Sequence, residues 1–388
     1  MTDTADVIVI GAGVQGASLA FHLASRGASV IVLEKATAAS GATGRSSGLV
    51  RIYYDLLAEA KLAWESYGWF ADWANRVGGD CGFTRTGFAW IEAAERIDRV
   101  RANSASHRAM GVDSQVIDAD GIRALFPALE IGDEVAAYEP ASGYADPFMT
   151  AAGFLAAAKQ RGARLVPGAE VSAIRTAGGQ VVGVDTNRGP VDAPVIVNAA
   201  GAWAGRVGGL VGLDLPIRVW RHDTGYLGVP ASVGRPIPVV IDIANGMYFR
   251  PEGHDMVLVG LEDDNQIGGS ADRDTSEAKA DFRDRAAERI IRRVPDLIEG
   301  TFRTSHSGQD GLTPDQRPML GAMGPDGFYL DCGHSGTGFK TAPAVGLGMA
   351  ELILDGAPRT VDLAPFAPTR YAEGRLLVGE HGEEQIWK

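Results

Sequence analysis

The chain has 388 residues, which at about 150 residues per domain predicts two to three domains and a core large enough to enclose a ligand. Its 36 basic and 49 acidic residues give a net charge of -13, which disfavours nucleic acid as a partner because phosphate binding needs clustered cations. A content of 45% hydrophobic and 22% charged residues is typical of a globular protein and excludes a disordered or fibrous chain.

The sequence carries no signal for export, membrane insertion or metal binding. It starts without a basic and apolar leader, and no apolar run reaches the roughly 20 residues that span a bilayer. Cys81 and Cys332 are too few for a four-cysteine zinc site and favour a reducing compartment. We therefore expect a cytoplasmic protein with no membrane span and no metal site.

In chain order, the first predicted unit is a strand, a helix and a second strand. The apolar run Val7–Ile10 predicts a buried strand, and the glycines after it open a helix that Gly27 ends. Ser29–Leu33 predicts the next strand, which Glu34 closes. This order is the fingerprint of a dinucleotide-binding unit, and a glycine-rich turn in another α/β fold is the alternative.

The glycines of this unit have distinct expected tasks. Gly11 makes the tight turn, Gly13 lets the backbone approach a pyrophosphate, and Gly16 lets the helix pack against the strand. The helix N-terminus is expected to face the phosphates, and the Glu34 carboxylate to accept a hydrogen bond from a ribose hydroxyl. The fingerprint alone does not separate FAD from NAD.

Later segments repeat this arrangement. A helix is predicted over Thr150–Arg161, followed by three meandering strands, the buried strand Val195–Asn198 and a glycine turn. An amphipathic helix is predicted from about Thr275 to Arg293, with Phe282, Ala286 and Ile290 on its apolar face. Residues 327–354 again read as strand, glycine turn and helix. Glycine turns at both ends of the chain favour a cofactor long enough to be held at both ends.

Five stretches of the chain together resemble one enzyme family, the FAD-dependent amine oxidases that include D-amino acid oxidase, glycine oxidase and sarcosine oxidase. They occur in the family's order from residue 6 to about residue 350. The loop SGATGRSSG is most similar to the sarcosine oxidase and dimethylglycine dehydrogenase branch. The stretches are VIVIGAGVQGASLAFHLASRGASVIVLEK, SGATGRSSGLVR, NAAGAWA, GLTPDQRPMLG and GHSGTGFKTAPAVG.

The resemblance implies a two-domain α/β fold. A Rossmann-like FAD-binding domain is expected to be discontinuous, formed by residues 1–83, 145–218 and 301–388. An α+β substrate domain built on a mixed or antiparallel sheet is expected from residues 84–144 and 219–300.

The resemblance also implies a set of cofactor-binding residues. Backbone N–H groups in the turn before the last helix are expected to face the N1/C2=O edge of the flavin, where the reduced ring gains negative charge. The expected cofactor-binding residues are Gly11, Gly13, Val14, Gln15, Gly16, Glu34, Lys35, Thr43, Arg45, Ser46, Ser47, Gly48, Val171, Ala200, Gly201, Trp203, Gly336, Thr337, Gly338, Phe339 and Lys340.

Four residues are expected to contact the substrate. Lys340 matches a lysine that helps to hold the substrate carboxylate in sarcosine oxidases, and Arg51 matches a family arginine near the flavin. Tyr248 matches a tyrosine that lines the substrate site, and Arg250, two residues further along a strand, points to the same face. A salt-bridged arginine and ordinary sheet packing remain the alternatives for these positions.

Departures from the family are equally informative. Gly308 occupies the place of the cysteine that carries covalent flavin in monomeric sarcosine oxidases, and the histidine that does so in dimethylglycine dehydrogenases is replaced near Ser47. Non-covalent FAD is therefore expected. Asp310 stands where glycine oxidase has a carboxylate-binding arginine, and Leu258 stands near the place of a lysine that assists the reaction with dioxygen.

The expected activity is FAD-dependent oxidation of the C–N bond of a glycine-like or N-substituted amino acid to an imine. The imine would hydrolyse to an amine and glyoxylate or another aldehyde or oxo acid. Dioxygen is the expected electron acceptor for the reduced flavin. One alternative is a dehydrogenase of the same fold that passes electrons to a protein or quinone. Another is an FAD subunit of a hetero-oligomeric sarcosine oxidase-like complex. A homo-oligomer is equally compatible with the sequence, and an NAD-dependent dehydrogenase is the remote possibility.

Overall fold

The first 34 residues form the expected strand, helix and strand. The computed structural model describes residues 3–381 and contains β2 (Val7–Ile10), α1 (Val14–Ser25) and β3 (Val30–Glu34) in this stretch. β2 and β3 pair in parallel, and all four residues of β2 are buried. A continuous apolar strand of this kind is typical of a parallel sheet that is covered on both faces.

This unit belongs to a six-stranded sheet with the order β10-β3-β2-β14-β22-β21. The first five strands are parallel, and only the edge strand β21 is antiparallel. The added strands are β10 (Arg164–Pro167), β14 (Val195–Asn198), β21 (Met319–Ala322) and β22 (Phe328–Cys332).

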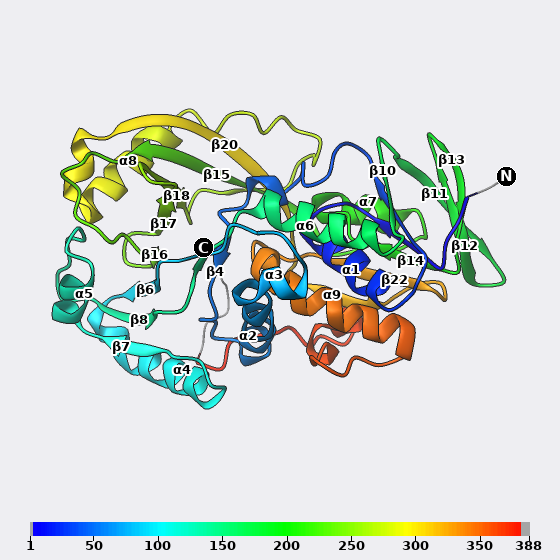
Figure 1. Cartoon of the computed structure of the whole chain (residues 1–388), viewed down its shortest axis with the longest axis horizontal. Helices are drawn as coiled ribbons and strands as arrows, with labels where there is room; N and C mark the ends of the chain where they lie inside the picture. Colours follow the sequence, from blue (N-terminus) through cyan, green and yellow to red (C-terminus); the bar gives the residue numbers. More distant parts are fainter. Residues whose placement is uncertain (1–2, 382–388) are drawn as a thin grey trace.

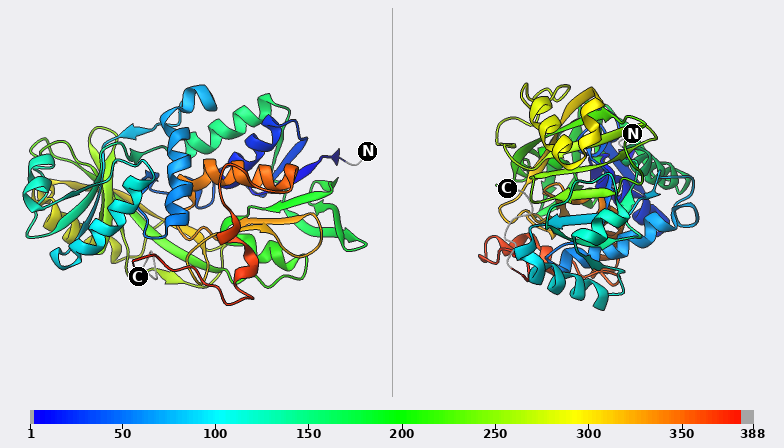
Figure 2. Two further views of the ribbon diagram at one scale, coloured as in Figure 1. Left: turned by 90° about the horizontal axis from the view of Figure 1, so that it is seen from below. Right: turned by 90° about the vertical axis from the view of Figure 1, so that its left-hand side faces the viewer.

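Each face of the parallel sheet has its own cover. Alternate residues of β2 point to opposite faces, so Val7 and Val9 pack with α1, α6 (Pro147–Gln160) and α9 (Gly338–Asp355). Figure 2 shows these helices together along one face. Ile8 and Ile10 pack instead against the predicted meander on the other face. The meander consists of β11 (Val171–Ala177), β12 (Gln180–Thr186) and β13 (Gly189–Asp192), and β1 (Asp3–Thr4) joins it at the edge.

The opposite end of the elongated molecule is a mixed sheet of nine strands (Figure 1). All of its strand pairs are antiparallel except the one between β16 and β6, and this mixed sheet confirms the predicted fold class. The strands are β6 (Phe88–Glu92), β7 (Gln115–Ile117), β8 (Val135–Glu139), β15 (Arg218–Gly228), β16 (Val239–Asp242), β17 (Met247–Glu252), β18 (Met256–Leu261), β19 (Gln266–Ile267) and β20 (Thr301–Leu312).

Three helices flank this sheet: α4 (Ile97–Ala109), α5 (Ala119–Leu125) and α8 (Phe282–Arg293). The prediction that α8 starts at about Thr275 is wrong, because the backbone before Phe282 bonds to the strands instead. The Ser307 N–H donates to the Thr275 carbonyl, and the Lys279 N–H donates to Asp223. The apolar face of α8 is buried as predicted.

The segments between the two large sheets contain a small three-stranded sheet and three helices. The strands of the small sheet are β4 (Leu49–Val50), β9 (Gly143–Tyr144) and β5 (Thr84–Arg85), and the helices are α2 (Leu57–Ala71), α3 (Trp73–Arg76) and α7 (Ala204–Gly209). The nine-stranded sheet takes its strands from residues 88–139 and 218–312, so β20 lies outside the range expected for the substrate domain. The division of the chain into two domains stays a prediction.

Among residues 3–381, no helix has the length and apolar character needed to cross a bilayer.

Candidate active site

One cavity of about 580 Å³ joins the ends of the parallel strands to the nine-stranded sheet. Most of the residues expected to bind cofactor or substrate line it: Gly11, Gly13, Val14, Gln15, Glu34, Lys35, Thr43, Arg45, Ser46, Ser47, Arg51, Val171, Ala200, Gly201, Trp203, Tyr248, Gly336, Gly338, Phe339 and Lys340. Four expected residues do not line it: Gly16, Gly48, Thr337 and Arg250.

One end of the cavity lies beside Gly11, Gly13 and Glu34, and we call it the outer end. Glycines there let neighbouring backbone segments approach each other closely. Gly11 has φ +111°, and a Cβ atom there would lie 2.5 Å from the Ala199 carbonyl oxygen. A Cβ atom at Gly16 would lie 2.1 Å from the Gly11 carbonyl oxygen, and one at Gly48 would lie 2.2 Å from that of Ala145. Gly16 and Gly48 therefore shape the site through packing and not through contact with its contents.

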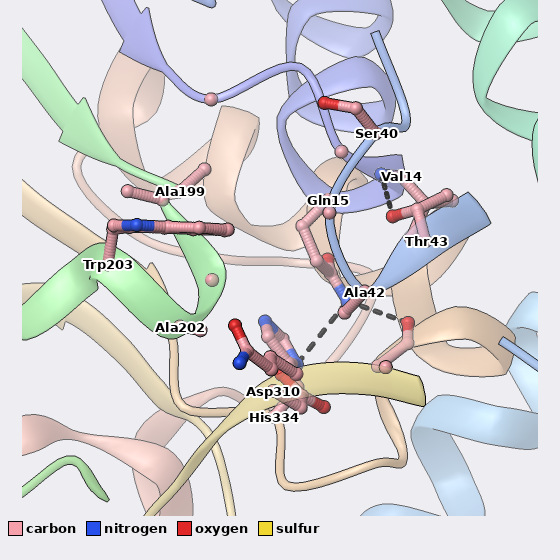
Figure 3. A pocket seen from close by; sticks show the side chains of 18 of the residues that line it. Val14, Gln15, Ser40, Ala42, Thr43, Ala199, Ala202, Trp203, Asp310 and His334 are labelled. Carbon is pink, nitrogen blue, oxygen red and sulfur yellow. Dashed lines mark hydrogen bonds between the residues drawn. The ribbon is translucent and has the colours of Figure 1, made fainter. Parts of the chain in front are cut away.

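Two side chains order the backbone around the start of α1. The Val14 N–H donates to Thr43 Oγ1 over 2.9 Å, from a short turn at residues 43–45 (Figure 3). Glu34 Oε2 accepts from the Ala12 N–H over 2.9 Å, and its Oε1 accepts from the Ala36 N–H. The Glu34 carboxylate is thereby fixed at the end of β3 while it borders the cavity.

Asp272 ties together three side chains at the rim of this outer end. It accepts from Lys35 Nζ over 3.1 Å and from Trp203 Nε1 over 2.7 Å, and it pairs with Arg206. Lys35 Nζ also lies 3.8 Å from the centroid of the Trp203 ring. Hydrogen bonds from Arg206, Trp203 and Lys35 hold the pKa of Asp272 well below its usual range. No motif around Asp272 marks this role, so sequence analysis missed it.

Further inside, Gln15 and His334 fix each other (Figure 3). Gln15 Nε2 donates to the Gly338 carbonyl over 2.7 Å and lies 3.3 Å from His334 Nδ1. His334 Nε2 lies 2.9 Å from Asp331 Oδ1, which orients the ring from the other side. Gln15 Oε1 is buried without a hydrogen-bond partner, so it offers an acceptor to a donor group in the cavity.

The glycine turn before α9 uses two of its N–H groups within the protein. The Gly336 N–H donates to Asp310 Oδ2 over 2.7 Å, and the Thr337 N–H donates to the His334 carbonyl over 2.9 Å. These two groups were expected to face the cofactor. Gly338 and Phe339, which border the cavity, are the expected residues of this turn that remain available for such contacts.

Two buried cations, Arg51 and Lys340, line the other end of the cavity, which we call the inner end. The Arg51 guanidinium lies 4.0 Å from the centroid of the Tyr54 ring, and Lys340 Nζ donates to the Tyr54 hydroxyl over 2.9 Å. Burial and the charge of Arg51 lower the pKa of Lys340 well below its usual value. In the part of the chain that the structure describes, neither cation forms an ion pair. Arg51 Nε is buried without a hydrogen-bond partner.

A buried carboxylic acid, Glu139, lies beside Arg51 and was not predicted. Its Oε2 accepts from the Ile52 N–H over 3.0 Å and from the Ser142 hydroxyl over 2.7 Å. Burial raises the pKa of Glu139 to about 7, against the opposing effects of these hydrogen bonds and of Arg51. Its protonation therefore changes near neutral pH.

Aromatic residues form the wall on the side of the nine-stranded sheet. His222 Nε2 hydrogen-bonds the Tyr248 hydroxyl, and the Trp220 ring stacks on His222 at 5.1 Å between centroids. Burial lowers the pKa of His222 to about 4, so the ring is neutral at neutral pH. Although Arg250 follows two residues after Tyr248 on β17, its guanidinium turns away to Glu252 and the Ser47 carbonyl.

Comparison with known proteins places these features in a family. Residues 6–352 match the DAO family model, described as FAD dependent oxidoreductase. Dimethylglycine dehydrogenase of Mus musculus is 27% identical over 96% of this chain and 44% of its own length, and sarcosine dehydrogenase of Homo sapiens is 28% identical over 92% and 40%. The chain thus spans less than half the length of these two relatives.

Other relatives match along their whole length. Glycine oxidase of Geobacillus kaustophilus is 30% identical over 96% of this chain and 98% of its own, and its crystal structure superposes with a TM-score of 0.84 over 95% and 99% of the two chains. L-proline dehydrogenase from P. horikoshii superposes with a TM-score of 0.90 at 26% identity, over 97% of this chain and 100% of the other. The chain belongs to the FAD dependent oxidoreductase (DAO) family.

Proposed function

We propose that this protein uses FAD to oxidise the C–N bond of a glycine-like or N-substituted amino acid to an imine. The observation that carries the proposal is one continuous cavity, which joins the dinucleotide fingerprint to two buried cations, Arg51 and Lys340. The similarity to dimethylglycine dehydrogenase, sarcosine dehydrogenase and glycine oxidase supports this substrate class.

The residues around the cavity fit FAD. The Glu34 carboxylate suits a ribose hydroxyl, and the N-terminus of α1 beside Gly13 suits a pyrophosphate. The orphaned Gln15 Oε1 suits an N–H donor further inside. When bound, FAD supplies the two-electron oxidant for the C–N bond.

Non-covalent attachment of FAD is part of this proposal. Gly308 borders the cavity and has no side chain to which a flavin could be joined. Among the described residues, Cys81 and Cys332 are buried away from the cavity, and the lining residues His222 and His334 are each engaged in hydrogen bonds. Free cysteines also suit the reducing cytoplasm, which we propose as the location.

The cations and the aromatic wall orient the substrate in this scheme. Arg51 and Lys340 bind the carboxylate, and because their charges are buried, each contact is worth more than it would be in water. Tyr248 and Trp220 exclude water from the side facing the nine-stranded sheet. Hydrolysis of the released imine gives an amine and glyoxylate, or another aldehyde or oxo acid.

Dioxygen is the proposed electron acceptor, and an acceptor protein or quinone is the second candidate. Leu258, near the place of the lysine that assists oxygen reduction in monomeric sarcosine oxidases, is fully buried in β18 and brings no charge to the site. The similarity to sarcosine oxidase subunit beta of Rhodobacter capsulatus, at 25% identity over 96% of this chain and 90% of that one, favours testing a partner subunit as well. Peroxide yield per turnover of the isolated chain separates these candidates.

The decisive experiment is an absorption spectrum of the purified protein during anaerobic addition of single amino acids. The panel contains sarcosine, glycine, D-proline and an N-alkyl glycine with a long substituent. Bleaching of the oxidised flavin band by any one of them is the expected result. A flavin that stays oxidised with all four overturns the proposed substrate class.

A further inference from the structure

An acidic residue, Asp310, borders the same cavity as the two cations. It lies on β20, two residues before the end of that strand. Burial raises the pKa of Asp310 above its usual value, against the hydrogen bonds from the Gly336 and Gly311 N–H groups and the charge of Lys340. The Asp310 side chain is thus half-buried and borders the cavity, so it can contact whatever occupies the cavity.

Two backbone bonds fix the direction of this carboxylate. Oδ1 accepts from the Gly311 N–H and Oδ2 accepts from the Gly336 N–H, each over 2.7 Å. A carboxylate oxygen has two lone pairs, so each oxygen keeps capacity for one further donor. Asp310 is thus a preorganised acceptor that needs no side-chain movement to receive an N–H group.

Asp310 and the cations influence each other without neutralising each other. The Asp310 charge raises the pKa of Lys340, whereas Arg51 lowers it. Among the described residues, Asp310 forms no ion pair with either cation. The cavity therefore presents separated positive and negative groups, a pattern complementary to a ligand that carries both a carboxylate and an amine.

We propose that Asp310 receives the N–H of the substrate amine, so that the site selects zwitterionic amino acids over simple carboxylates. The proposal rests on the function proposed above and assigns the amine end of the substrate, as Arg51 and Lys340 take the carboxylate end. A substrate with a second carboxylate close to its amine is disfavoured, because the Asp310 charge repels it.

The test compares ligands that differ only at the amine. Sarcosine is paired with methoxyacetate, glycine with glycolate and D-proline with tetrahydrofuran-2-carboxylate, and the pair used is the one whose amino acid reduces the flavin. The dissociation constant of the amino acid comes from the concentration dependence of anaerobic flavin reduction, and that of the oxygen analogue from its perturbation of the flavin spectrum. Holoenzyme with and without Asp310→Asn is measured.

Asp310→Asn is expected to weaken amino acid binding about tenfold or more, because a charge-assisted hydrogen bond is lost, while binding of the oxygen analogue changes little or tightens. Equal weakening of both ligands overturns the proposal, because it shows that Asp310 acts only by supporting the turn at Gly336. Unchanged binding of both also overturns it. Lys340→Met is the matched variant, which should weaken both ligands alike.

The unmodified enzyme provides a second measurement that does not depend on the variant folding. Because the oxygen analogue brings no cation to Asp310, its affinity should rise more steeply than that of the amino acid as pH falls through the raised pKa of Asp310. A gain of positive charge on Lys340 over the same range favours the carboxylate of both ligands alike, so the difference between the two pH profiles reports on Asp310. Parallel pH profiles for the two ligands overturn the proposal. If the proposed function itself is wrong, the result is different: no amino acid reduces the flavin of the unmodified enzyme.

Discussion

The two ends of the cavity are built in different ways. At the outer end, the groups that shape the site come mainly from one stretch of chain, residues 7–45, and their bonds join backbone N–H groups to Glu34 and Thr43. At the inner end, Arg51, Asp310 and Lys340 come from three distant segments, and their charges are buried together. The comparison teaches that a common cofactor can be recognised by a local motif, whereas a specific substrate requires residues that only the complete fold assembles.

The largest effect is expected from adding one carbon atom at the outer end. In Gly16→Ala, the new Cβ meets the Gly11 carbonyl oxygen at 2.1 Å, and backbone atoms must shift to relieve the overlap. We expect purified protein without flavin, or no folded protein, as measured by absorption and circular dichroism. Gly205→Ala on α7 is the control, since no atom lies within 4 Å of its added Cβ. Full flavin content in Gly16→Ala would contradict the close packing of α1.

A large effect confined to catalysis is expected from the inner end. Lys340→Met removes a buried cation of the proposed carboxylate site, and loss of a charge-assisted contact should lower kcat/KM by about a hundredfold. Flavin content should remain normal, which separates the two ends of the cavity. Lys159→Met, at an exposed lysine in the last turn of α6, should leave kcat/KM unchanged. A loss of flavin in Lys340→Met that equals the loss of activity would show that the ends are not independent.

Burial of charge at the inner end should also appear in the pH dependence of stability. The folded-state pKa of Glu139, about 7, lies above its value in an unfolded chain, so its stabilising contribution is complete at low pH and is lost as pH rises through the folded-state pKa. Glu139→Gln should reduce the fall in unfolding free energy between pH 5 and pH 7 by about 2 kcal/mol or less. Chemical denaturation at several pH values measures this slope. An unchanged slope would mean that Glu139 stays ionised in the folded protein.

The smallest effect is expected from the rim of the outer end. Asp272→Asn weakens the bonds to Lys35, Trp203 and Arg206, and because these groups are partly exposed we expect FAD release to accelerate only about threefold. Fluorescence of the released flavin measures the rate. Asp274→Asn, on the same segment but bonded to Ser276, is the control. The difference between the two variants should shrink at high salt, and equal release rates at low salt would remove Asp272 from cofactor retention.

The difference between the two ends of the cavity also explains which parts of the fold and the site can be predicted from the sequence. The strand, helix and strand of residues 7–34 are predictable because glycine spacing and apolar runs act over short distances. The positions of Arg51 and Lys340 are reached only through resemblance, since nothing in their local sequence marks a shared cavity. Asp272 and Glu139 were missed because most of their partners lie tens to hundreds of residues away.

Local reasoning also failed where backbone hydrogen bonds compete. The helical pattern before Phe282 yields to bonds with Ser307 and Asp223, and the Gly336 N–H goes to Asp310 and not to the cavity. Tyr248 lines the cavity, as the resemblance implies, but the guanidinium of Arg250, which strand alternation put on the same face, bonds to Glu252 and the Ser47 carbonyl. In each case, a hydrogen bond or ion pair that the local sequence pattern does not reveal decides the outcome.

The long pairing of β15 with β20 has a mechanical consequence. Eleven residue pairs run from Arg218–Leu312 to Gly228–Thr301, with one register shift between Tyr226 and Leu227, and Trp220, His222 and Asp310 all lie on this ribbon. A two-stranded ribbon anchored in one sheet and bonded to the turn before α9 resists hinge bending between the halves of the molecule. Because the ribbon holds Trp220, His222 and Asp310 on two paired strands, we expect these three side chains to keep their relative positions when a substrate enters or leaves.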